Sequence, residues 1–144
     1  MTEIAFHFNA TDCLAYACRL LRKAVNRSAK LVVTGSPETL QQFDEALWIF
    51  SATDFVPHCY LESRRAMIAA SPVILAKSIE LAPSLPILLN LGKFVPGGFE
   101  RFERVIEIVG LADQDRQLAR SRWKEYADQG YAMTRHDVNL KPSY

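Results

Sequence analysis

The chain has 144 residues, of which 49% are hydrophobic and 23% are charged, and its formal net charge at pH 7 is +1. This length predicts a single domain spanning residues 1–144, and the composition is typical of a soluble globular protein. The near-neutral charge argues against a general duplex-DNA binder, which would show a strongly basic domain.

The cysteines and the N-terminus indicate a cellular compartment. Cys13, Cys18 and Cys59 form no CxxC pair, and an odd count without an export signal predicts reduced thiols. Residues 1–8 lack a basic region followed by an apolar stretch, and no apolar run approaches the roughly 18 residues that span a bilayer. We therefore expect a cytoplasmic protein, with no membrane among its partners.

The first half of the chain alternates strand and helix patterns. Residues 3–8 predict a strand, and Thr11 with Asp12 supplies the start of a helix that runs to about residue 26. A short buried strand is expected over residues 30–34. Ser36 and Pro37 suit the N-cap and first turn of a helix ending near residue 48.

The second half predicts further strands and a long last helix. Extended segments are expected over residues 56–61, 71–79, 87–91 and 105–109, a short helix over 99–103, and a helix from 113 to about 129 that Gly130 caps. Residues 133–144 are polar, and we expect them to form a mobile tail. The order of elements predicts an α/β sandwich with a largely parallel sheet.

One tryptophan does not fit the core face of its helix. Leu40, Phe43, Leu47 and Phe50 share one face of a helical wheel, whereas Trp48 points roughly 120° away, at about 100° per residue. Phe55 follows seven positions later, after the expected helix end. Two such aromatic residues suit an anchor for a partner protein. The alternative is that both residues cover the edge of the core.

Catalytic and cofactor motifs are missing. The first strand leads into Asn-Ala-Thr-Asp instead of GxGxxG, and GxxxxGK[ST] is absent from the chain. His58 and Cys59 are adjacent, which is too weak a pattern to indicate a zinc site. They are also unsuited to act as base and nucleophile, because neighbouring side chains in an extended segment point to opposite faces. Asp44 and Glu45 suit a solvated helix edge. The sequence therefore predicts no catalytic residue, no metal and no cofactor, although a helix N-terminus can still hold an anion.

The last helix carries a basic line. Arg116, Arg120 and Lys124 are spaced four residues apart and form one stripe, with Trp123 between that stripe and the expected buried side. Arginines beside an indole suit a short acidic peptide with an apolar end. The alternative is a solvated basic face that favours the helix dipole.

Two blocks of sequence resemble a known family. Residues 44–48 (Asp-Glu-Ala-Leu-Trp) with 55–58 (Phe-Val-Pro-His), and residues 117–126 with Gly130-Tyr131, are similar to the chi subunit of bacterial DNA polymerase III holoenzyme. The resemblance implies a Rossmann-like, three-layer α/β fold without a nucleotide-binding motif. It implies a non-catalytic accessory subunit that links the clamp-loader complex to the single-stranded-DNA-binding protein, so that DNA is contacted only indirectly.

The resemblance also implies which residues bind partners. Arg116, Arg120, Trp123 and Lys124 match the family site for the acidic C-terminal tail of the single-stranded-DNA-binding protein, with tryptophan where tyrosine is common. Trp48 and Phe55 match the face that meets the psi subunit or an XPD-like helicase. The alternatives are an unrecognised small α/β nucleotide-binding protein or enzyme, and a direct single-stranded nucleic-acid binder.

Overall fold

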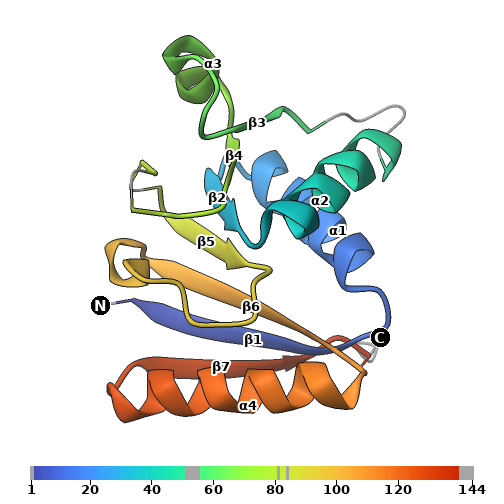
Figure 1. Ribbon diagram of the computed structural model, residues 1–144, viewed down its shortest axis with the longest axis vertical. Helices are drawn as coiled ribbons and strands as arrows, with labels where there is room; N and C mark the ends of the chain where they lie inside the picture. The colour runs from blue at the N-terminus through green and yellow to red at the C-terminus, as the bar shows by residue number, and fades with distance from the viewer. Residues whose placement is uncertain (1, 51–55, 81, 84, 140–144) are drawn as a thin grey trace.

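The computed structural model describes residues 2–50, 56–80, 82–83 and 85–139 (Figure 1). The elements in chain order are β1 (Glu3–Ala10), α1 (Cys13–Asn26), β2 (Leu31–Thr34), α2 (Pro37–Phe50), β3 (His58–Tyr60), α3 (Arg65–Ala70), β4 (Val73–Ala76), β5 (Ile87–Asn90), the 3-10 helix η1 (Phe99–Arg101), β6 (Arg104–Gly110), α4 (Asp113–Asp128) and β7 (Ala132–Asp137). Each element predicted from the sequence is present, within a few residues of its expected bounds.

The strands form one sheet in the order β3-β4-β2-β5-β6-β1-β7. Every neighbouring pair is parallel, so the prediction of a largely parallel α/β sheet is confirmed. Parallel strands buried on both faces read as continuous apolar runs, which is why the segments Leu-Val-Val-Thr of β2 and Val-Ile-Leu-Ala of β4 are fully buried.

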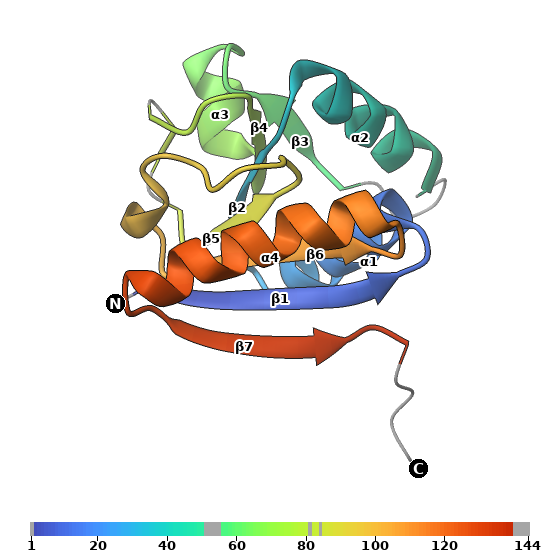
Figure 2. The same ribbon diagram turned by 60° about the horizontal axis from the view of Figure 1, so that its bottom comes forward.

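Helices cover both faces of the sheet, and each face has its own core. Figure 2 shows α4 in front of β1 and β6, and α1 behind them. The α1 and α2 side buries Leu21, Phe43 and Leu47, whereas the α4 side buries Phe99 and Tyr126. The predicted core face of α2 is confirmed for Leu40, Phe43 and Leu47; the side chain of Phe50 lies outside the described part.

Helix starts follow the expected capping chemistry. The Asp12 carboxylate accepts from the Ala15 N–H at 3.1 Å, and the Ser36 hydroxyl accepts from the Thr39 N–H at 3.1 Å. Gly130, which follows the C-cap residue Gln129 of α4, adopts φ +81, the left-handed conformation expected of a glycine that ends a helix. None of the described helices is long and apolar enough to cross a lipid bilayer.

The expected mobile tail was wrong for its first residues. Ala132–Asp137 forms β7, which pairs in parallel with β1 at the edge of the sheet, with Phe6 opposite Arg135 and His7 opposite His136. A polar strand is stable there because its backbone hydrogen bonds to β1, while its side chains stay largely in water. Residues 140–144 lie outside the described part. The six-residue helix α3 had no counterpart in the sequence prediction.

Candidate partner-binding sites

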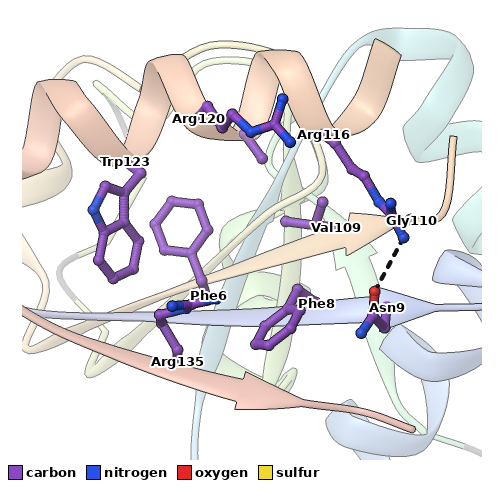
Figure 3. Close-up of a pocket in the computed structure, with 10 residues that line it drawn as sticks. Phe6, Phe8, Asn9, Val109, Gly110, Arg116, Arg120, Trp123 and Arg135 are labelled. Atoms are coloured by element: carbon purple, nitrogen blue, oxygen red, sulfur yellow. Dashed lines mark hydrogen bonds between the residues drawn. The ribbon is translucent and has the colours of Figure 1, made fainter. Parts of the chain in front are cut away.

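A pocket of about 470 Å³ lies between α4 and the strands β1, β6 and β7 (Figure 3). We call it the basic pocket, and its lining consists of Phe6, Phe8, Asn9, Val109, Gly110, Arg116, Ala119, Arg120, Trp123 and Arg135. Arg116, Arg120 and Trp123 point toward it from α4, and Arg135 reaches it from β7. Segments more than a hundred residues apart in sequence therefore build one cavity.

The floor of the basic pocket is apolar and firmly packed. Phe6, Val109 and Ala119 are buried beneath it. Trp123 meets Phe6 edge to face, with ring centroids 5.1 Å apart, an arrangement that aromatic pairs favour. The half-buried indole and the buried phenyl ring together give the pocket an aromatic lining.

The walls are cationic. Arg116 is half-buried, and its Nη2 donates to Asn9 Oδ1 at 3.3 Å, which holds the guanidinium over the end of β1. The Arg135 guanidinium lies 5.1 Å from the centre of the Phe8 ring, a cation–π contact. Among the described residues that line this pocket there is no aspartate or glutamate, so the positive charge of three arginines is unopposed inside it.

Backbone irregularity places Asn9 in the wall. The register of β1 against β6 shifts between His7 and Ala10, and Asn9 has φ 66, a left-handed conformation that asparagine tolerates better than most residues. Asn9 uses its amide twice, because Nδ2 also donates to Asp137 Oδ1 at 3.2 Å. The bulge thus joins β1, β7 and α4 at one side chain.

A buried polar cluster fixes α4 to the sheet. Glu107 of β6 is fully buried and accepts from Arg122 Nε at 3.0 Å, Tyr126 Oη at 2.7 Å and Asn90 Nδ2 at 2.9 Å. Burial raises the pKa of the Glu107 carboxyl, an effect that the Arg122 guanidinium and these hydrogen bonds oppose. Burial and the nearby carboxylate raise the pKa of Tyr126, which keeps its hydroxyl a donor. Arg122 therefore faces the core.

Most of the residues predicted for tail binding lie together. Arg116, Arg120 and Trp123 line the basic pocket, whereas Lys124 is exposed on α4 and does not line it. Sequence reasoning missed Arg135, because residues 133–144 were expected to be a mobile tail. Residues 132–137 show no alternation of apolar and polar residues, so the sequence offered no strand signal for this segment.

The second predicted surface is the one that carries Trp48 and Phe55. Its described part, which we call the Trp48 face, consists of Asp44, Trp48, Ile49 and His58. Trp48 is 61% exposed and Ile49 is 81% exposed, so the prediction that Trp48 points away from the core is confirmed. Its indole meets the His58 ring edge to face, with centroids 5.9 Å apart. Phe55, the other aromatic predicted for this surface, lies outside the described residues.

Asp44 is not the solvated helix edge that the sequence suggested. Its Oδ1 lies 2.5 Å from His58 Nε2, and His58 Nδ1 lies 2.8 Å from the Val56 carbonyl oxygen. Tyr60 Oη donates to Asp44 Oδ2 at 3.4 Å. This chain of contacts ties the last turns of α2 to β3 beneath Trp48.

Metal ligands do not gather in the described part of the chain, where no three histidine, cysteine or carboxylate side chains are grouped as a metal would need. His7 and His136 face each other across β1 and β7, with ring centroids 5.1 Å apart. His7 Nδ1 lies 2.5 Å from the Tyr16 hydroxyl. His58, which the sequence places beside Cys59, has its two ring nitrogens in contact with Asp44 and the Val56 carbonyl.

The sheet and the basic pocket define a Rossmann-like α/β protein with an arginine-lined pocket. Residues 1–134 match the family model described as DNA polymerase III chi subunit, HolC. The chain is also 32% identical over 141 residues to a DNA polymerase III subunit chi of Pseudomonas aeruginosa, covering 94% of this chain and 96% of that relative. It therefore belongs to the chi-subunit family, as an accessory subunit of a multi-subunit polymerase complex in DNA replication.

Proposed function

We propose that this chain is a non-catalytic adaptor that links the clamp-loader complex to single-stranded-DNA-binding protein by gripping that protein's acidic C-terminal tail. The observation that carries the proposal is the basic pocket, in which three arginines surround an aromatic floor and none of the described lining residues is a carboxylate. Guanidinium groups bind carboxylates in a bidentate manner, and a buried aromatic floor suits an apolar chain end.

In this proposal the tail lies across α4. Its acidic residues pair with Arg116 and Arg120, its terminal aromatic residue packs against Trp123, and Lys124 attracts the tail from outside the pocket. Arg135 adds a guanidinium from the opposite wall. The contacts are exposed to solvent, so the affinity is expected to fall with salt.

The proposal assigns the Trp48 face to the clamp-loader side. Two neighbouring exposed apolar side chains, Trp48 and Ile49, support a protein interface there, with Phe55 carried over from the family pattern. The expected partner is the psi subunit or, in its place, an XPD-like helicase. Two modest contacts joined in one adaptor raise the effective concentration of each partner, so no catalysis or cofactor is needed and the site of action is the cytoplasmic replication complex.

Calorimetry with an acidic peptide ending in Asp-Ile-Pro-Phe tests the tail site. We expect micromolar binding that weakens with salt and is lost when the terminal phenylalanine is removed. Arg120→Ala should weaken binding by about 1–3 kcal/mol, the range for hydrogen bonds to charged groups. Lys23→Ala is the matched control, because Lys23 is an exposed cation in the last turn of α1, on the opposite side of the sheet. Equal binding by both variants would contradict the assignment of the tail to the basic pocket.

A further inference from the structure

A second cavity, of about 690 Å³, opens where the direction of the chain reverses within the sheet. The chain leaves β2 through α2 toward β3, and leaves β5 toward β6 on the opposite side, although β2 and β5 are neighbours. In open parallel sheets, ligands bind in the crevice beyond the carboxyl ends of two such strands. We call this cavity the switch crevice; its lining includes Thr34, Ser36, Lys77, Asn90, Lys93 and Phe94.

Backbone donors face this position. Ser36 precedes Pro37, the first residue of α2, a helix of 14 residues whose N-terminus carries partial positive charge. The N–H groups of Ser36 and Glu38 find no acceptor within the described part of the chain. Free amides at a helix start are the usual cradle of a phosphate group.

The switch crevice also contains a buried hydroxyl group, that of Thr34. Thr34 ends β2, is only 5% exposed and lines the switch crevice, yet its hydroxyl makes no hydrogen bond to any other described residue. Its register partner Asn90, by contrast, has both amide atoms occupied, by Phe94, Glu107 and Gly92. A buried polar group without a partner is costly, so a ligand that bonds Thr34 would recover that cost.

Charge and shape at the rim indicate the ligand. Lys77 and Lys93 are exposed, line the crevice and form no ion pair with described residues. Phe94, 75% exposed, presents an aromatic face at the same rim. Glu38 is the opposing charge among the lining residues, and it is exposed, so water screens it.

We propose that the switch crevice binds a nucleotide, with its phosphate at the N-terminus of α2 and Thr34, between Lys77 and Lys93, and its base against Phe94. This site lacks the glycine-rich motifs and lies after β2, not after β1, so a search for those motifs does not find it. It is separate from the basic pocket, which α4 forms with β1, β6 and β7 toward one edge of the sheet. A free nucleotide and one unit of single-stranded DNA share this chemistry.

Amide chemical shifts of the full chain, titrated with AMP, with ATP and with inorganic phosphate, test the site. We expect shifts at Gly35, Ser36 and Gly92, with phosphate alone shifting only the first two. Thr34→Val, which removes the hydroxyl at nearly constant volume, and the double variant Lys77→Ala/Lys93→Ala should each weaken nucleotide binding about ten-fold. Phe94→Ala should reduce nucleotide affinity to that of phosphate.

The controls separate this site from others. Lys23→Ala/Lys30→Ala removes two exposed lysines elsewhere and should bind as the unaltered chain does. If an oligothymidylate, but no free nucleotide, shifts the same amides, the crevice stands and its ligand is nucleic acid. Absence of shifts at millimolar concentration of every probe, shifts centred on Arg120 and Trp123, or equal binding by the lysine double variant would each overturn the proposal.

Discussion

The basic pocket and the Trp48 face are built in opposite ways. The Trp48 face comes from one stretch of chain, the end of α2 and the start of β3, held by the contact between Asp44 and His58. The basic pocket needs β1, β6, α4 and β7, and its helix is fixed by a buried ion pair. A surface built from one stretch is visible in sequence, whereas a pocket assembled from distant strands depends on the fold.

The largest effect is expected when the buried ion pair that holds α4 beside the basic pocket is broken. Arg122→Ala leaves Glu107 as a buried carboxylate without its cation, and we expect the free energy of unfolding to fall by about 3–5 kcal/mol. Urea denaturation measures it. Arg120→Ala, two residues away on the exposed side of the same helix, should change it by no more than about 0.5 kcal/mol. Similar losses in the two variants would contradict the assigned role of the buried pair.

The next effect separates the two surfaces. Trp48→Ala should weaken capture of the psi subunit or helicase by about 2 kcal/mol or more, the usual cost of truncating a central interface aromatic. Tail-peptide binding, measured on the same sample by calorimetry, should stay unchanged because the basic pocket shares no residue with the Trp48 face. Loss of both interactions would show that the two surfaces are coupled.

A smaller effect ranks the cations around the pocket. Arg135→Ala should weaken tail binding by about 1 kcal/mol, because the exposed guanidinium lines the pocket over Phe8. Lys124→Ala, which removes the same charge outside the pocket lining, should cost less than about 0.5 kcal/mol at moderate salt. The reverse ranking would place the tail along the outer stripe of α4.

The stability of the strand pair that carries Arg135 should depend on pH. Burial first, then His136 and Arg104, lower the pKa of His7 from 6.5 to about 4. Between pH 6.5 and pH 4 the unfolded chain binds a proton at His7 that the folded chain does not. The free energy of unfolding is therefore unaffected by His7 above pH 6.5 and decreases as the pH falls toward 4. The urea concentration at the unfolding midpoint should therefore decrease as the pH is lowered from 6.5 to 4.

A matched variant tests the assignment to His7. His7→Gln cannot titrate but keeps a polar side chain beside Tyr16, so its stability should depend less on pH over the same range. An unchanged slope would assign the titration to other groups.

Much of the fold could be predicted from sequence because its signals are local. Asp12 and Ser36 mark helix starts through bonds only three residues long, and the apolar runs of β2 and β4 reflect strands covered on both faces. The alternation of elements then favours a parallel sheet. For the same reason Trp48 was recognised as exposed from its place on one helix.

Only the tertiary structure shows the features that depend on contacts between segments far apart in the sequence. The polar segment 132–137 becomes a strand only because β1 offers it a free edge, and that pairing brings Arg135 to the basic pocket. Burial of Glu107 is set by α4 packing over β6, which no spacing within either element specifies. The sequence alone thus indicated most residues of the basic stripe on α4 and the exposure of Trp48. Which of them share a cavity was decided by the order of strands in the sheet, because that order sets which distant segments become neighbours.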